Sequence, residues 1–269
     1  MSNLSLRIIT AFILGTVALW VSVKGGIYFF IFAMIVGMGL LYEWQIITKA
    51  HHKKIARFVS WGFYLIFALL LFYRFDYCAF FLFIAAAFLC LISGRSFKWV
   101  GLGYLYATLP VYALISIRGD SQEGLVSLIF LYAIVWGTDI GAYFIGKTFG
   151  GPKLSPRFSP KKTWSGAVGG VIIAILSAIS YLFYIESYDI LRVSLFLFIA
   201  FLSIVSQLGD ICESAVKRYF HVKDSSNLLP GHGGVMDRMD GLIFAAILFY
   251  LVAFLKVGPK NIEFFLGSF

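Results

Sequence analysis

Charged side chains are scarce in this sequence of 269 residues. They make up 13% of it, whereas 61% of the residues are hydrophobic. Soluble domains carry about 25% charged and about 45–50% apolar residues. A soluble globular protein is therefore excluded, and the composition predicts a membrane protein.

Cysteine is also scarce, with only Cys78, Cys90 and Cys212. Their odd number and the absence of a C-x-x-C spacing argue against a disulfide framework and against a zinc site. We expect all three to be buried thiols. The sequence also lacks internal repeats, low-complexity tracts and long linkers, so residues 1–269 are predicted to form a single integral-membrane domain.

Long polar stretches are rare because apolar runs recur along the whole chain. A helix needs roughly 17–25 residues to cross a hydrocarbon core of about 30 Å. Nine runs approach or reach this length: residues 8–23, 26–42, 58–73, 77–92, 100–117, 124–146, 164–185, 191–209 and 242–257. The predicted fold is therefore all-α and polytopic, with about nine transmembrane helices.

Positive charge is unevenly distributed over the loops that these nine runs define. The N-terminus and every second loop carry 16 Lys and Arg residues, and the opposite side carries 6. The positive-inside rule then predicts a cytoplasmic N-terminus and a C-terminus outside. The net charge of +9 is explained by this topology and by attraction to anionic membrane lipids, so a nucleic-acid partner is not expected.

Three polar segments fall on the predicted cytoplasmic side, and the first two together span residues 136–166. In a helix, Trp136, Asp139, Tyr143 and Lys147 would lie on one stripe. A carboxylate within a membrane helix indicates function, although Asp139 could instead fix helix packing through an ion pair.

The second polar segment is rich in proline and in basic residues. Pro152, Pro156 and Pro160 recur at a spacing of four and forbid a regular helix. Lys161 and Lys162 stand just before the seventh apolar run, where a helix N-terminus can bind an anion. We expect phosphate binding here; the alternative is a positive-inside loop without a ligand.

The third segment, residues 207–241, begins on a predicted helix. Asp210, Ser214 and Lys217 would share one face of it, with Arg218 at its flank. Glu213 stands four residues before Lys217, so either acidic residue could pair with this lysine.

A glycine-rich turn follows, and then a second helix start. Glycines such as Gly233 and Gly234 permit the close backbone approach that a phosphate-binding turn needs, and His232 is typical of a hydrogen-bonded turn residue. Asp237 and Asp240 are spaced i, i+3 on one face of the next helix; both could also act only as helix caps.

Together the segments combine carboxylates, cations and glycine turns at one depth. Carboxylates suit Mg²⁺, which proteins hold with one or two of them plus substrate phosphates. Cations and backbone N–H groups suit the phosphates. The pattern indicates phosphoryl or nucleotidyl transfer between a soluble nucleotide and a lipid.

The stretch SAVKRYFHVKDSSNLLPGHGGVMDRMD, residues 214–240, resembles the signature of the phosphatidate cytidylyltransferases, also called CDP-diglyceride synthetases. The fixed positions of that signature are met by Ser214, Lys217, Arg218, Lys223, Asp224, Pro230, His232, Gly233, Gly234, Asp237, Arg238 and Asp240. The Asp139 segment and the S-P-K-K-T loop extend the resemblance over about the C-terminal half.

The resemblance implies a multi-pass enzyme, a homodimer, that converts CTP and phosphatidic acid to CDP-diacylglycerol and pyrophosphate. It implies Mg²⁺, with a monovalent cation such as K⁺, at Asp210 and Asp237. The substrate-binding residues would be Ser214, Arg218, Lys161, Lys162, Lys223, Gly233, Gly234 and Arg238. Asp210, Lys217 and Asp237 would be catalytic, with Asp139, Asp224, Asp240 and His232 as supporting or alternate groups. One position departs from the pattern, because Ser165 stands where the family's loop usually has glutamate.

Two other functions fit parts of the pattern. A CTP-dependent polyprenol kinase would use a similar cytoplasmic segment but would release CDP. A transporter would place its polar residues toward the midplane in repeated halves, which this sequence does not show. The absence of a long polar N-terminal extension favours a bacterial plasma (inner) membrane, with the active site facing the cytoplasm.

Overall fold

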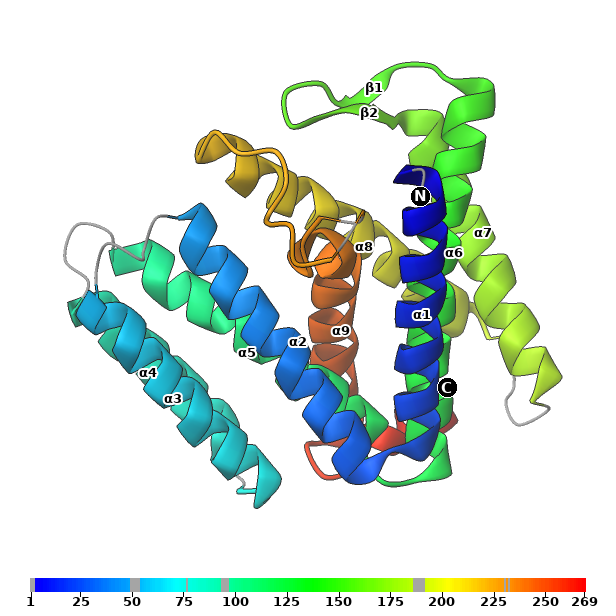
Figure 1. Cartoon of the computed structure of the whole chain (residues 1–269). Coiled ribbons are helices and arrows are strands. Elements are labelled where there is room, and N and C mark those ends of the chain that lie inside the picture. Colours follow the sequence, from blue (N-terminus) through cyan, green and yellow to red (C-terminus); the bar gives the residue numbers. More distant parts are fainter. Residues whose placement is uncertain are drawn as a thin grey trace. The chain divides into compact units, whose positions relative to one another are not determined.

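The computed structural model describes residues 3–48, 54–75, 77–92, 97–185, 192–229, 231 and 233–269. Its elements are the helices α1 (Asn3–Lys24), α2 (Gly26–Ile47), α3 (Lys54–Phe72), α4 (Cys78–Ile92), α5 (Phe97–Arg118), α6 (Gln122–Phe149), α7 (Trp164–Tyr184), α8 (Val193–Tyr219), α9 (Met236–Val257) and the 3₁₀ helix η3 (Ile262–Ser268), with strands β1 (Lys153–Ser155) and β2 (Ser159–Thr163) (Figure 1). The protein is thus mostly helical, as predicted.

Each predicted apolar run falls on one of the helices α1 to α9. Within the described parts of the chain, seven helices are long and apolar enough to cross a membrane: α2, α3, α5, α6, α7, α8 and α9. The apolar parts of α1 and α4, Ile9–Lys24 and Cys78–Ile92, are shorter. The protein therefore has the helices of a multi-pass membrane protein.

Two helices extend well past their apolar runs into polar sequence. Helix α8 continues to Tyr219 although its run ends at Gly209, and α9 begins at Met236, before its run. The polar end of α8 is stabilised by the i, i+4 ion pair of Glu213 and Lys217. Both predicted polar helix ends are therefore helical.

The proline-rich segment is not helical, as expected, but it is more ordered than a loop. Strands β1 and β2 pair antiparallel, with Lys153 opposite Thr163 and Ser155 opposite Ser159. The hairpin leads from α6 into α7 (Figure 1). The all-α prediction missed this small sheet, because three prolines in a short segment hide the strand pattern.

The chain divides into two compact units. One comprises Met1–Ile115 and Phe220–Arg238, and the other comprises Ser116–Tyr219 and Met239–Phe269. Segments distant in sequence thus fold together within each unit, and the signature is shared between the two.

In the first unit, aromatic side chains tie α2 to its neighbours. The Tyr64 hydroxyl on α3 donates to the Met34 carbonyl oxygen at 2.8 Å. The Trp44 indole N–H donates to the Trp99 carbonyl oxygen at 2.7 Å, and its ring packs on the backbone of α5 at Gly103. These contacts hold α2 against α3 and α5.

In the second unit, α6 and α7 pack closely through glycines. A Cβ added at Gly137 would meet Ser177, and one at Gly170 would lie 2.9 Å from the Thr138 carbonyl oxygen. Small residues let membrane helices approach backbone to backbone. The Thr138 and Ser203 hydroxyls, 2.7 Å apart, link α6 to α8.

The cysteines only partly match the prediction. Cys78 is buried and Cys90 is half-buried, but Cys212 is exposed. The prediction was wrong for Cys212, because α8 continues past its apolar run and this residue lies on the open side of the polar end.

Candidate functional site

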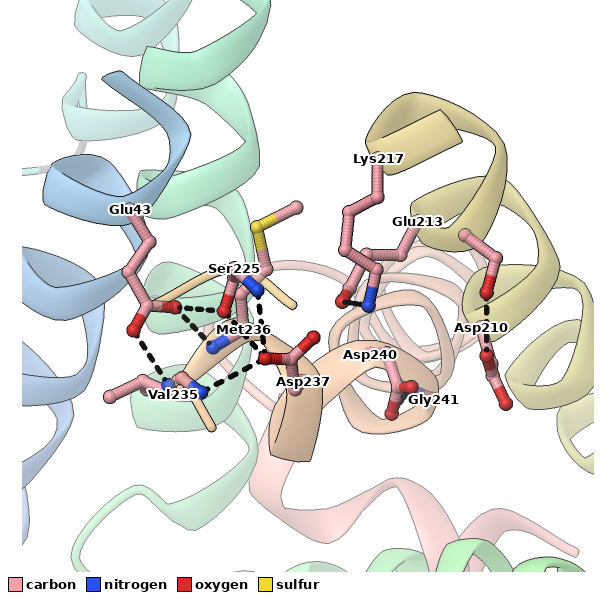
Figure 2. Close-up of polar contacts among 12 residues, drawn as sticks. Glu43, Asp210, Glu213, Lys217, Ser225, Val235, Met236, Asp237, Asp240 and Gly241 are labelled. Atoms are coloured by element: carbon pink, nitrogen blue, oxygen red, sulfur yellow. Dashed lines mark hydrogen bonds and ion pairs between the residues drawn. The ribbon is translucent and has the colours of Figure 1, made fainter. Parts of the chain in front are cut away.

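A buried carboxylate, Glu43, stands near the C-terminal end of α2, and its side chain is 0% exposed. Its Oε1 accepts hydrogen bonds from the Ser226 hydroxyl at 2.6 Å and the Val235 N–H at 2.8 Å. Its Oε2 accepts from the Met236 N–H at 2.7 Å and the Ser225 hydroxyl at 2.9 Å (Figure 2). Glu43 thus binds the N–H groups at the start of α9, which have no acceptor inside that helix.

Asp237, in the first turn of α9, has its own set of donors. Its Oδ2 accepts from the Ser225 N–H at 3.0 Å, the Ser225 hydroxyl at 2.8 Å and the Gly234 N–H at 2.9 Å (Figure 2). The Ser225 hydroxyl therefore lies between two carboxylates, those of Glu43 and Asp237.

The glycine turn packs against these carboxylates. Gly233 has φ 84°, a left-handed conformation that favours glycine, and its backbone pairs with Leu229. A Cβ added at Gly234 would collide with Ser225 Oγ and lie 2.5–2.6 Å from the Glu43 oxygens. These glycines are approached closely by side chains of the chain itself, and the approach to a phosphate stays a prediction.

Asp210, on α8 in the second unit, faces a cation. The Lys162 ammonium of β2 forms an ion pair with Asp210 Oδ2 and also approaches the Gln207 carbonyl oxygen at 3.5 Å. The Ser214 hydroxyl donates to Asp210 Oδ1 at 3.4 Å. The hairpin therefore brings Lys162 to the helical face on which the sequence places Asp210 and Ser214.

Lys217 pairs with Glu213. Its ammonium lies 2.9 Å from Glu213 Oε1, and the Glu213 side chain is buried (Figure 2). An i, i+4 spacing brings two side chains together on a helix, whereas Asp210 is seven residues, about 10 Å of helix rise, away. Of the two acidic residues that the sequence left as possible partners, the structure pairs Lys217 with Glu213.

Helices α8 and α9 cross closely beside Asp210. A Cβ added at Gly209 would lie 2.8 Å from the Asp240 carbonyl oxygen, and one at Gly241 would meet the buried Ser206 hydroxyl. Asp240 Oδ1 accepts from the Gly241 N–H at 2.8 Å. Asp240 therefore belongs to the α8–α9 crossing next to Asp210.

The start of α7 is fixed by hydroxyl groups. Thr163 is its N-cap and accepts from the Gly166 N–H at 3.1 Å. Ser165 donates to the Gly150 carbonyl oxygen and lies 3.1 Å from the Thr163 hydroxyl. Ser165, which replaces the expected glutamate, thus closes the base of the hairpin.

The stripe predicted on α6 is confirmed, because Trp136, Asp139, Tyr143 and Lys147 are all exposed on one helical face. The Lys147 ammonium lies 5.7 Å from the centre of the Tyr143 ring. Several other predicted residues are exposed as well: Lys161, Arg218, Lys223, Asp224 and Arg238. His232 and Pro230 lie outside the described residues.

The structure contains no cluster of three or more His, Cys, Asp or Glu side chains suited to a metal ion within the part of the chain that it describes.

Sequence reasoning missed Glu43, Ser225 and Ser226. The predicted apolar run ended at Tyr42, so Glu43 was placed in a loop, whereas α2 continues to Ile47. A carboxylate next to an apolar run is itself a signal of function when the helix continues past it. The two serines stand inside the signature but carry no charge that would draw attention.

Comparison with known proteins gives a consistent set of relatives. A profile of the cytidylyltransferase family matches residues 5–256. A phosphatidate cytidylyltransferase of Brucella abortus is 40% identical over 274 residues, which cover 100% of both chains. A phosphatidate cytidylyltransferase of Bacillus subtilis is 41% identical over 156 residues, 58% of each chain. One of Rickettsia bellii is 40% identical over 166 residues, 60% of this chain and 71% of the relative.

Proposed function

This chain belongs to the cytidylyltransferase family, and from this premise we propose that it is a phosphatidate cytidylyltransferase. It transfers the CMP group of CTP to phosphatidic acid and forms CDP-diacylglycerol and pyrophosphate. The observation that carries the proposal is the 40% identity to the Brucella abortus enzyme over the full length of both chains.

The reaction needs no nucleophile from the protein. A phosphate oxygen of phosphatidic acid, already anionic, attacks the α-phosphorus of CTP, and the bond from that phosphorus to the β-bridging oxygen breaks. Pyrophosphate leaves with the electron pair of this bond. The protein has to position two anionic substrates and neutralise the charge that develops on the phosphate oxygens.

Mg²⁺ is proposed to bind at Asp210 and Asp237, with Asp139, Asp224 and Asp240 as supporting or alternate groups. The donors fit a hard cation, since they are carboxylate oxygens, and Asp210 already accepts the Lys162 ammonium. When bound, Mg²⁺ neutralises the triphosphate and acts as a Lewis acid. Asp210 and Asp237 belong to different units, so their pairing, like a K⁺ ion at this site, rests on the sequence resemblance.

The cations are proposed to bind phosphate. Lys217, Arg218, Arg238 and Lys223 belong to the signature, and Lys161 and Lys162 approach from the hairpin. Lys162 can take part in two contacts, the ion pair with Asp210 and a contact with phosphate. A metal cation at Asp210 would displace the Lys162 ammonium, which could then bind a phosphate oxygen. Ser214 and the backbone of Gly233 complete the proposed substrate contacts. Gly234 serves the site by donating its N–H to Asp237 Oδ2, and His232 remains a supporting group of the turn.

In the membrane we propose nine spans, a cytoplasmic N-terminus, a C-terminus outside and a homodimer. The distribution of 16 Lys and Arg residues against 6 supports this orientation. The active site then faces the cytoplasm at the inner membrane of a bacterium, where CTP is available and phosphatidic acid reaches the site from the lipid.

The proposal is tested with purified enzyme in detergent, phosphatidic acid and each nucleoside triphosphate in turn, with and without Mg²⁺. We expect CDP-diacylglycerol and pyrophosphate from CTP, in equal amounts and only with Mg²⁺. Release of CDP together with a phosphorylated lipid would identify a kinase instead and would refute the proposed reaction.

A further inference from the structure

The buried carboxylate of Glu43 is not explained by helix packing alone. Leaving an ionised carboxylate in a buried site without partners costs several kcal/mol, so such groups are found hydrogen-bonded. Glu43 meets this requirement with the Ser226 hydroxyl and two backbone N–H groups, and the Ser225 hydroxyl is a fourth group within hydrogen-bond distance. All four come from one short stretch, residues 225–236, so Glu43 holds the loop and the start of α9 together.

Ser225 connects this carboxylate to Asp237. Its Oγ lies 2.9 Å from Glu43 Oε2 and 2.8 Å from Asp237 Oδ2. A hydroxyl carries one proton and can donate to only one of two carboxylates at a time. The position of the Asp237 carboxylate is therefore coupled to that of Glu43 through a single side chain.

Oδ2 of Asp237 has three donor groups within hydrogen-bond distance. The Ser225 N–H, the Ser225 hydroxyl and the Gly234 N–H all converge on Oδ2. The two N–H groups, joined by the Ser225 hydroxyl whenever it donates to Asp237, restrict the location of this oxygen. The absence of a side chain at Gly234 makes this convergence possible.

From these contacts we propose that Glu43 is a positioning residue, which acts through Ser225 to hold the Asp237 carboxylate in the orientation needed to bind the divalent cation. The proposal rests on the proposed function, because it assigns a purpose to the orientation of Asp237. It adds Glu43 and Ser225 to the residues on which the reaction depends.

The test compares Ser225→Ala with Ser226→Ala. Each variant removes one hydroxyl that donates to Glu43, but only the Ser225 hydroxyl also contacts Asp237. Residues that orient a metal ligand typically contribute about 10–100-fold to metal affinity. We expect Ser225→Ala to raise the half-saturating Mg²⁺ concentration at least about tenfold, and Ser226→Ala to leave it within about twofold.

A second measurement is independent of turnover. Binding of Mn²⁺ alone to the purified variants, followed by electron paramagnetic resonance, should weaken in the same order. Glu43→Gln should weaken it as well, because a Gln amide offers one acceptor oxygen where the carboxylate offers two. The double variant with Ser225→Ala should lose less than the sum of both changes.

Equal Mg²⁺ half-saturation in the two serine variants would overturn the proposal, even if both melt at lower temperature. So would a Glu43→Gln enzyme that binds Mn²⁺ like the wild type. These results differ from a failure of the proposed function, in which the wild-type protein itself would form no CDP-diacylglycerol.

Discussion

At the residue scale, the acidic side chains of the described chain have two kinds of partner. Glu43 and Asp237 are held by hydroxyl and backbone N–H donors, which are fixed parts of the fold. Asp210 is paired with Lys162, whose flexible side chain another cation can replace. The first arrangement orients a carboxylate, and the second neutralises one by an ion pair.

Gly234→Ala should disrupt the first arrangement. The added methyl group would collide with Ser225 Oγ and press on both Glu43 oxygens, so the turn or the carboxylates must move. Overpacking of this kind costs about 1–3 kcal/mol. We expect faster thermal inactivation in detergent. We also expect the remaining activity to need a higher Mg²⁺ concentration for half-saturation.

Gly62→Ala is the matched control, because a Cβ at that position of α3 meets nothing within 4 Å. It should inactivate at the wild-type rate. Wild-type stability and wild-type Mg²⁺ half-saturation for Gly234→Ala would contradict the packing described here.

At the scale of elements, the hairpin β1–β2 is the part of the second unit that brings a basic side chain to α8. Its register places Thr163 at the N-cap of α7, and Lys162 directly before it pairs with Asp210. Neighbouring residues on a strand point to opposite faces. Lys161 is accordingly exposed while Lys162 is half-buried.

Lys162→Ala should weaken the binding of CTP but not the binding of the metal ion. Loss of a charge-assisted hydrogen bond, worth about 1.5–3 kcal/mol, should raise the KM for CTP about tenfold or more. Binding of Mn²⁺ without nucleotide should not weaken, because Asp210 then has no competing ammonium. Steady-state kinetics measures the KM for CTP, and electron paramagnetic resonance measures the binding of Mn²⁺.

Lys153→Ala removes the same charge from an exposed position of β1 and serves as the control. It should change the KM for CTP less than about twofold, as expected for an exposed charge. An unchanged KM in Lys162→Ala, or a loss of Mn²⁺ binding, would show that this lysine does not exchange between Asp210 and phosphate.

At the scale of the whole molecule, the topology depends on which helices cross the membrane. The described chain has seven long apolar helices, and the apolar parts of α1 and α4 are shorter. Short helices can still span when the bilayer thins locally or flanking side chains extend to the interface. We propose nine spans because they place 16 Lys and Arg residues on one side and 6, among them Lys24 and Arg74, on the other.

Single cysteines in a background without Cys78, Cys90 and Cys212 test this topology. With nine spans, Lys24→Cys and Arg74→Cys should react with a membrane-impermeant maleimide added to intact cells. Lys54→Cys should react only in inverted vesicles. Labelling of Arg74→Cys solely from the cytoplasmic side would show that α4 does not cross.

Much of this protein follows from local sequence. Apolar runs located all nine α-helices of the described chain, because each run forms its own hydrogen bonds along the helix. Helical spacing likewise placed Asp210 next to Ser214, and the stripe from Trp136 to Lys147 on one face. The signature identified the family, which the full-length relatives confirm.

Contacts between elements could not be read in the same way. The Ser225 hydroxyl reaches Glu43 across 182 residues, and Lys162 meets Asp210 only because the hairpin folds onto α8. The sequence also left the partner of Lys217 open, and the structure gives Glu213 as that partner. The sequence by itself determined the helices, the polar segments and the family, since these depend on short-range periodicity and residue type. Only the tertiary structure decided which carboxylate each donor contacts, because that depends on how separate helices pack.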